Sequence, residues 1–332
     1  MVEALAAGRR VVGNDLNSIA AFVARVKTTP LQRPEIRAVR RWTKQVRKIT
    51  YRASRDEIVA YLQPEKMKNM DLPRARFIKK WVASALATIS ALPTLNSQSF
   101  ARCIVLRTAQ WALDGRRKQT SLPDFRERLA GWSLEMLEQL GIFGAEISNH
   151  LRSNPDACVL AHGDAVHIPM LPAFCDAKQK VSLVVTSPPY PGVHVLYHRW
   201  QVDGRRESPA PYWIINGTDG ETASFYTFGD RRRSTSEPYF ENSLRTLCAV
   251  RRVIRRGGFM VQLLAFNDPS VHLDRYLANM VAAGFEEVLL STQHASAKVT
   301  RIWRDVPNRK WHAAYQGQTH SAREVVLIHR AV

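Results

Sequence analysis

The residues best suited to chemistry in this 332-residue chain follow a short apolar run at 181–185. Five of them come directly after that run: Thr186, Ser187, Pro188, Pro189 and Tyr190. The run itself is typical of a parallel strand buried on both faces, and ligands of open α/β sheets bind beyond the carboxyl ends of the strands. Prolines fix the backbone and lack N–H groups. We therefore expect the Ser187 hydroxyl and the Pro188 carbonyl to accept hydrogen bonds from an exocyclic amino group, and Tyr190 to stack on a flat base.

The segment from Ser187 to Tyr190 resembles the catalytic motif of the DNA amino-methyltransferases, Ser/Asn/Asp-Pro-Pro followed by Tyr, Phe or Trp. These enzymes move a methyl group from S-adenosylmethionine to N4 of cytosine or N6 of adenine. The Thr-Ser-Pro-Pro-Tyr form is similar to that of the cytosine-N4 group, whereas adenine-N6 enzymes more often begin the motif with Asp or Asn. The resemblance implies catalytic roles for Ser187, Pro188, Pro189 and Tyr190. It also implies a place for Thr186 beside the cofactor, S-adenosylmethionine.

Two further segments fit the same resemblance in the same order along the chain. Residues 11–17 look like the end of the family's second strand, where an acidic residue, here Asp15, binds the ribose hydroxyls of the cofactor. Residues 162–165 look like the third-strand motif, where Asp164 binds the adenine amino group. Each residue also suits an ordinary structural use, Asp15 as a helix N-cap and Asp164 in a tight turn.

One part of the family pattern is absent from the sequence. Family members carry a first strand and a glycine-rich loop before a segment that resembles residues 3–10, and Met1 falls inside the helix that should follow that loop. Such a loop lets the backbone approach the methionine part of the cofactor closely. We therefore expect a truncated reading frame, half of a split enzyme or a fragment, with weak binding of S-adenosylmethionine by this chain alone. An upstream segment of the same reading frame and a second chain are the two expected sources of the loop.

Arginines near the catalytic motif are candidate contacts to DNA. They interleave with aromatic residues and recur in a later Gly/Ser/Thr-rich stretch: Arg199, Arg205, Arg206, Arg231, Arg232 and Arg233. Arginines beside aromatic rings suit phosphate contact and base stacking, and a plain surface role fits each of them equally well. His194 and His198 have no carboxylate or cysteine partner at zinc spacing, so no metal is expected.

The balance of charge favours a polyanionic partner. The chain has 48 Lys and Arg against 29 Asp and Glu, a net charge of +19, and residues 1–150 hold 26 and 13 of these, a net +13. Such an excess repels itself unless a polyanion is bound, and basic charge supports non-specific binding of nucleic acid. No apolar run is long enough to span a membrane, and the opening residues do not resemble a signal peptide. Four scattered cysteines without a CxxC pair fit a reducing cytoplasm.

The patterns divide the chain into three parts. Residues 1–30 predict the N-terminal part of an incomplete methyltransferase domain, with a strand near 10–14 and a helix after it. Residues 31–150 predict a basic helical insertion, and residues 151–332 the remainder of the domain with the catalytic motif. The expected helices lie at 34–50, 54–62, 73–89, 97–113, 123–143, 241–253 and 271–283. The expected later strands lie at 158–161, 181–185, 259–264, 285–291 and 324–329, with a turn at 255–258.

Strands alternating with helices predict an α/β fold. We expect a doubly wound, mostly parallel sheet of the Rossmann-like methyltransferase type, with an antiparallel edge pair and the helical insertion. The expected function is site-specific methylation of DNA, of the kind found in restriction–modification, in the cytoplasm. The target base must leave the duplex stack, and cytosine N4 is favoured. The alternatives are adenine-N6 methylation, methylation of an RNA amino group, and a non-catalytic DNA-binding remnant or subunit of a split enzyme.

Overall fold

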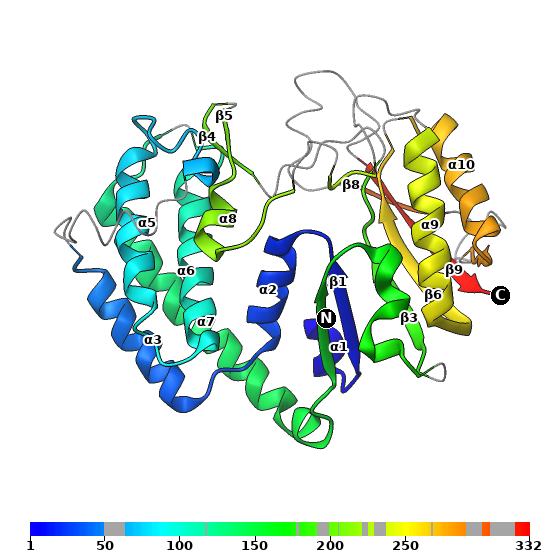
Figure 1. The fold of residues 1–332 in the computed structure, drawn as a ribbon, viewed down its shortest axis with the longest axis horizontal. Coiled ribbons are helices and arrows are strands. Elements are labelled where there is room, and N and C mark those ends of the chain that lie inside the picture. Colours follow the sequence, from blue (N-terminus) through cyan, green and yellow to red (C-terminus); the bar gives the residue numbers. More distant parts are fainter. Residues whose placement is uncertain are drawn as a thin grey trace, which may run out of the picture. The chain divides into compact units, whose positions relative to one another are not determined.

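The computed structural model describes residues 1–49, 64–116, 118–176, 179–190, 199–204, 206–220, 225–228, 237–266, 268–289, 301–305 and 323–332. These residues form a mixed α/β fold that divides into two compact units (Figure 1). Unit 1 consists of Met1–His162 and Leu196–Asp219, and unit 2 of Gly163–Val195 and Gly220–Val332. Each unit is described by itself.

Unit 1 contains a small parallel sheet next to its first helices. Strands β1 (Val11–Asp15) and β2 (Cys158–His162) pair in parallel, so that Asp15 and His162 lie opposite each other. Helices α1 (Val2–Ala6) and α2 (Ser18–Thr28) flank β1 in the chain. Asn17 caps α2, because its side-chain oxygen accepts the N–H of Ile19 at 2.9 Å.

The rest of unit 1 is mainly helical. Its long helices are α3 (Arg33–Val46), α5 (Arg76–Ile89), α6 (Leu95–Leu113) and α7 (Leu122–Ser153), with a short η1 (Pro64–Lys66). Their core includes Trp81 and Phe125, both almost fully buried, whose rings meet edge to face at 4.9 Å. Four of the predicted helices are therefore confirmed, and the one predicted at 54–62 lies outside the described residues.

Two elements of unit 1 carry no periodic signal in the sequence. Strands β4 (Trp200–Asp203) and β5 (Arg206–Ser208) form an antiparallel hairpin, and α8 (Ala210–Ile215) follows it. Every residue of α8 is buried, which leaves no polar face to reveal a helical period. The helix packs against α6, where Arg102 Nη1 donates to the Ile214 carbonyl at 2.7 Å.

Unit 2 is built on a five-stranded mixed sheet. The order is β3 (Val181–Thr186), β6 (Ile254–Leu264), β9 (Arg323–Ala331) and β7 (Phe285–Glu287), with β8 (Ile302–Asp305) also paired to β9. Strands β3 and β6 are parallel, and the other pairs are antiparallel. The chain also forms α9 (Glu237–Val253), α10 (Pro269–Ala282), η2 (Ala165–Met170) and η3 (Pro172–Phe174).

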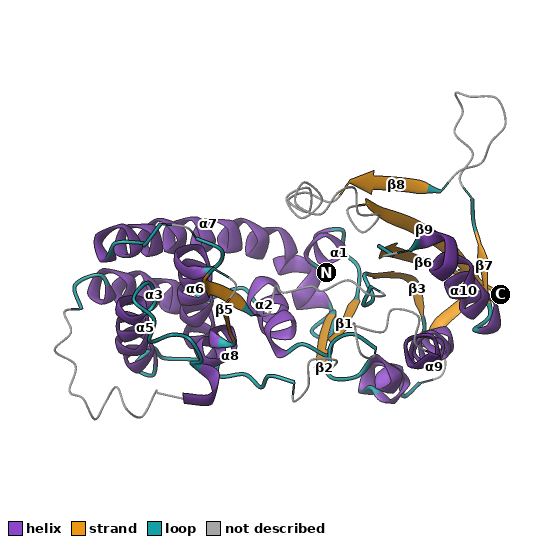
Figure 2. Cartoon of the chain, turned by 90° about the horizontal axis from the view of Figure 1, so that it is seen from above, coloured by secondary structure: helices purple, strands orange, loops and turns teal. Residues whose placement is uncertain are grey.

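The two faces of this sheet differ in exposure. Helices α9 and α10 lie beside the sheet in Figure 2, and one face of the sheet supplies Met260 and Leu264 to a core that also contains residues of both helices. On the strands β3 and β6, side chains that alternate with the covered ones reach solvent: Leu183 is 54% exposed, Val185 66% and Phe259 42%. These apolar side chains share one face at the β3 edge, because Leu183 pairs with Phe259 and side chains alternate along a strand.

The α/β class predicted from the sequence is confirmed, and so is the antiparallel pairing of the last predicted strands, now β7 and β9. The sheets are small and mixed, because β9 runs antiparallel to both of its main neighbours. The turn predicted at 255–258 is wrong: those residues lie inside β6. Gly257 has φ +75° and the β3–β6 register shifts nearby, so glycine accommodates an irregularity in the strand instead of ending it.

The units divide at His162 and place residues 1–30 together with the helical region, so the three-part division of the sequence stays a prediction. Within the described ranges, no helix is both long and apolar enough to cross a membrane.

Candidate functional site

The predicted catalytic segment begins where β3 ends. Thr186, the last residue of β3, pairs with Gln262 of the parallel strand β6 and is half-buried. Ser187 follows it and is exposed. Its hydroxyl lies 3.3 Å from the Leu263 carbonyl. The segment therefore stands beyond the carboxyl end of a parallel strand, as the sequence predicts.

A chain of hydrogen bonds leads from Ser187 into the sheet. Ser187 Oγ lies 2.8 Å from the Tyr190 hydroxyl, which donates to Glu324 Oε1 at 2.7 Å. The other oxygen of Glu324 accepts from both Nε and Nη2 of Arg304, at 2.9 and 2.7 Å. Tyr190 has a single hydroxyl hydrogen, and it donates this hydrogen to the Glu324 carboxylate. The single hydrogen of Ser187 is then directed to two acceptors, the Tyr190 oxygen and the Leu263 carbonyl, which leaves the lone pairs of the Ser187 oxygen as acceptors for a ligand.

The prolines and the tyrosine of the motif are held firmly. Tyr190 is only 7% exposed and belongs to the core of unit 2, so in this conformation its ring packs inside instead of offering a free face to a base. The buried Tyr239 donates its hydroxyl to the Pro189 carbonyl at 2.9 Å, and burial raises the pKa of Tyr239 well above its usual value. The Pro188 carbonyl receives no hydrogen bond from the described residues.

Sequence reasoning missed Glu324 and Arg304, although both complete the chain of hydrogen bonds. Glu324 is 4% exposed at the start of β9, and Arg304 faces it across the β8–β9 pair. Glu324 could have been found from the sequence, because it begins an apolar strand, Glu324-Val325-Val326-Leu327, at an inward position. A carboxylate is rarely buried without a partner. No comparable signal marks Arg304, since β8 itself is not predicted.

Asp164 lies in unit 2, apart from the motif's hydrogen bonds. It is exposed and caps η2, because its Oδ1 accepts the N–H of Val166 at 3.0 Å. Its Oδ2 accepts no hydrogen bond from the described residues. Asp164 therefore has a structural role in a turn, as the sequence allows, and its second carboxylate oxygen remains for a ligand.

Asp15 lies in unit 1 at the end of β1, where its Oδ1 accepts the N–H of Asn17 at 2.7 Å. Although the residue reaches solvent, surrounding atoms desolvate the carboxyl and raise its pKa, and the Asn17 N–H and nearby His162 oppose this rise. Its Oδ2 has no hydrogen-bond donor in the described part of the chain. Asp15 and Ser187 belong to different units.

The hydrogen-bond acceptors of Asp15 and Asp164 fit one part of S-adenosylmethionine. A carboxylate oxygen is a suitable acceptor for ribose hydroxyls at Asp15 and for the adenine amino group at Asp164. The methionine end needs close approach by backbone, and the described residues near Asp15 and Asp164 offer no run of glycines for it. Gly13 lies in β1, where a Cβ would meet Met1 and Leu160, so this glycine serves packing.

The predicted DNA contacts have different outcomes. Arg199 forms an ion pair with Asp219 at 2.8 Å, in which both side chains are partly buried, so its charge is already compensated. Arg206 lies exposed in β5. The remaining predicted contacts lie outside the described residues: Arg205, Arg231, Arg232 and Arg233.

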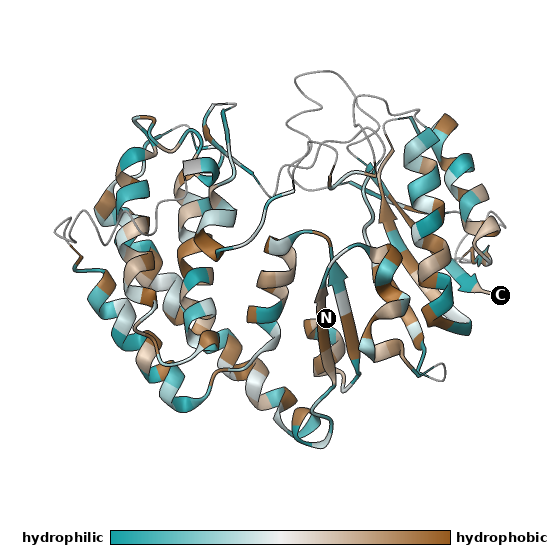
Figure 3. Ribbon diagram, viewed as in Figure 1, coloured by the Kyte–Doolittle hydropathy of each residue, from teal (hydrophilic) through white to brown (hydrophobic). Residues whose placement is uncertain are grey.

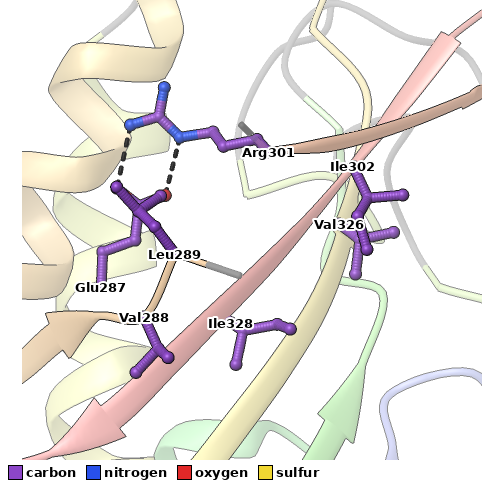
Figure 4. Close-up of a pocket in the computed structure, with 7 residues that line it drawn as sticks. All are labelled: Glu287, Val288, Leu289, Arg301, Ile302, Val326 and Ile328. Carbon is purple, nitrogen blue, oxygen red and sulfur yellow. Dashed lines mark hydrogen bonds and ion pairs between the residues drawn. The ribbon is translucent and has the colours of Figure 1, made fainter. Parts of the chain in front are cut away.

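A shallow hollow elsewhere in unit 2 contains none of the predicted site residues. Arg301 binds Glu287 there through two hydrogen bonds of 2.7 and 2.9 Å, and this pairing lowers the pKa of Glu287 (Figure 4). The lining residues are Glu287, Val288, Leu289, Arg301, Ile302, Val326 and Ile328. Its only charged groups neutralise each other, so the hollow is a junction of β7, β8 and β9.

Across the described residues, no group of three or more His, Cys, Asp and Glu is placed to hold a metal ion. Comparison with known proteins adds no relative: no family model, no curated protein and no solved structure matches the chain.

Proposed function

We propose that the chain is an S-adenosylmethionine-dependent amino-methyltransferase acting on a base flipped out of DNA, with cytosine N4 as the favoured target. The observation that carries the proposal is Ser187, an exposed hydroxyl beyond the carboxyl end of β3. Its hydrogen is directed toward the Tyr190 oxygen and the Leu263 carbonyl, and Tyr190 in turn donates to Glu324. A serine held in this way presents lone pairs, which suits an amino group better than it suits an anion.

In the proposed reaction, Ser187 and Pro188 orient the target amino group. Ser187 Oγ accepts one N–H and the Pro188 carbonyl accepts the other, and this aims the nitrogen lone pair. S-adenosylmethionine supplies the methyl group when bound, with Asp15, Asp164 and Thr186 proposed to hold it. Positioning is the chief contribution of the protein, and no covalent intermediate with the chain is required.

The buried Glu324 carboxylate supports this geometry through its hydrogen bond with Tyr190. It fixes the Tyr190 hydroxyl at 2.7 Å, and Arg304 holds the carboxylate in turn. Chains of hydrogen bonds polarise one another, so a negative charge at the inner end strengthens Ser187 as an acceptor. We propose Glu324 as a positioning residue that acts through Tyr190.

The edge of β3 supports the proposal that a second polypeptide chain contributes a strand. Within the described residues, β3 pairs only with β6, and its neighbouring side chains Leu183 and Val185 are largely exposed. Parallel sheets are normally covered on both faces, and an unpaired apolar edge is a template for another strand. With an added strand at this edge the sheet would approach the doubly wound arrangement.

The deciding experiment measures modified nucleosides by mass spectrometry in DNA and RNA from cells that express the chain with its full genomic locus. We expect N4-methylcytosine in DNA, and its loss in Ser187→Ala. Ser182→Ala is the matched control, because Ser182 is an exposed serine of β3, the strand that Ser187 follows, and methylation by this variant should stay near the wild-type level.

Other outcomes separate the alternatives. N6-methyladenine that depends on Ser187 would move the target to adenine, and a modified base found only in RNA would replace DNA as the substrate. Equal methylation in wild type and Ser187→Ala, or none in any sample, would overturn the assignment of this site.

A further inference from the structure

Helix α3 in unit 1 carries a face made of positive charge. Its exposed Lys and Arg, together with two that follow it in the chain, form what we call the α3 basic face: Arg33, Arg37, Arg40, Arg41, Lys44, Arg47 and Lys48. At about 100° per residue these positions fall within an arc of about 120°. Much of α3 is hydrophilic in Figure 3.

The opposite face of α3 is anchored in the helical core. Val39, Trp42 and Val46 are buried. Trp42 Nε1 donates to Thr88 Oγ1 of α5 at 2.9 Å, and the hydroxyls of Thr43 and Ser133 lie 2.7 Å apart. The orientation of the helix is therefore fixed, and the basic face is held outward by packing.

No carboxylate neutralises the basic face within the described residues. The single acid of α3, Glu35, is 6% exposed. It accepts the N–H of Gln32 at 2.6 Å and the hydroxyl of Thr94, so it closes the start of the helix. None of the seven cations makes an ion pair in the part of the chain that the structure describes.

This arrangement is unfavourable for the helix by itself. Arg33 and Arg37, Arg37 and Arg41, and Arg40 and Lys44 are spaced four residues apart within α3, and like charges at that spacing destabilise a helix by a few tenths of a kcal/mol per pair. An external polyanion removes this repulsion. The spacing suits a nucleic acid: residues 33–48 span about 22 Å of helix, or one cation per about 3 Å, and each DNA strand carries one phosphate per about 3.4 Å of axis.

A membrane surface fits less well. Basic amphipathic helices bind membranes by burying their apolar face among the lipids, and in α3 that face is already packed against α5 and α7. We therefore infer that the α3 basic face binds the phosphodiester backbone of a nucleic-acid duplex. The inference goes beyond the proposed function, because it names a surface in unit 1 and is tested by binding without any methyl transfer.

The experiment measures binding of the full chain to a fluorescent 20-base-pair DNA duplex of arbitrary sequence by anisotropy, over a series of salt concentrations. The test variant is Arg37→Gln/Arg40→Gln/Lys44→Gln. The control removes the same net charge from unit 2, in Arg275→Gln/Arg323→Gln/Arg330→Gln, whose arginines already pair with carboxylates. Circular dichroism establishes that both variants are folded.

We expect the α3 variant to bind about ten- to a hundredfold more weakly at 0.1 M salt and to lower the slope of log K against log salt by up to about 2.7, or 0.9 per lost phosphate contact. The control should change affinity less than about threefold. Parallel arms with duplex RNA distinguish the two sources of phosphodiester, and α3-dependent binding of either duplex supports the inference. Equal losses in both variants, unchanged affinity in the α3 variant, or α3-dependent binding only to anionic vesicles would overturn it.

Discussion

The arginines of two regions, unit 2 and the α3 basic face of unit 1, are used in opposite ways. In unit 2, five of them reach carboxylates: Arg275, Arg301, Arg304, Arg323 and Arg330. On the α3 basic face of unit 1, seven cations reach none within the described residues. Internal pairing shows that an arginine serves the fold, whereas a rigidly presented and uncompensated set is the basis of our proposal that its partner is another molecule. A total net charge cannot make this distinction.

Acid should affect the two regions very differently. His329, on β9, is 1% exposed, and burial lowers its pKa from 6.5 to about 4. Between these values the unfolded chain binds a proton that the folded chain does not, so stability rises with pH across this window and is lost as the pH falls from about 7 to about 4. The expected loss is up to about 3 kcal/mol. Hydrogen exchange of β9 amides, corrected for intrinsic rates, measures it.

The α3 amides provide the internal control for this measurement, because arginine and lysine stay charged throughout the window. A His329→Leu variant should lose most of the pH dependence in β9. The same acid loss in that variant would assign the effect to other groups, among them Glu287 and Arg301, which lie near His329.

Two carboxylates of unit 2 allow the contribution of a buried ion pair to stability to be compared with that of an exposed one. Glu324→Gln removes the charge that Tyr190 and Arg304 share at a position whose side chain is 5% exposed, and we expect the free energy of unfolding to fall by about 1–3 kcal/mol. Glu286→Gln breaks the exposed cross-strand pair with Arg330 and should cost less than about 1 kcal/mol. Urea titration of both variants makes the comparison, and equal costs would show that burial of Glu324 is unimportant.

The smallest expected effect is on α3 itself. Arg37→Gln/Arg41→Gln removes a like-charge pair, so stability should rise by a few tenths of a kcal/mol while affinity for duplex falls. A thermal melt and one binding titration suffice. A clear loss of stability would mean that these arginines serve the fold after all, and would remove the contrast between the units.

The sequence is informative where a pattern is local. The buried run of β3, its end at Thr186 and the exposure of Ser187 follow from a few adjacent residues, and α3, α5 and α6 follow from apolar spacing. Sequence patterns fail where contacts distant in the chain determine the secondary structure. Helix α8 is buried on all sides, and β8 becomes a strand through pairing with β9. Gly257–Gly258 has the composition of a turn but lies in a strand that pairs with β3.

The candidate site shows the same division. Ser187 and its place are predictable, whereas Glu324 reaches the site from 134 positions further along the chain than Tyr190. Tyr190 is the instructive case: its position in the motif is evident, but the burial of its ring depends on the core residues of α9 and β9. The positive charge of residues 31–150 is also evident in the sequence. That seven of its cations share one face of α3, without an ion pair among the described residues, becomes visible only in the fold.

The composition of unit 1 from two separate stretches has a consequence for the order in which the protein can form during synthesis. Helix α8 belongs to Leu196–Asp219, and its Tyr212 and Trp213 are almost fully buried. Ser18 Oγ reaches the Thr218 carbonyl at 2.7 Å, so the second helix of the chain is completed by residues made 200 positions later. A ribosome that has released only the first 162 residues therefore holds an unfinished core. Chaperones that shield nascent apolar surface are expected to engage the chain in that interval, and stalling before α8 emerges should leave it sensitive to protease.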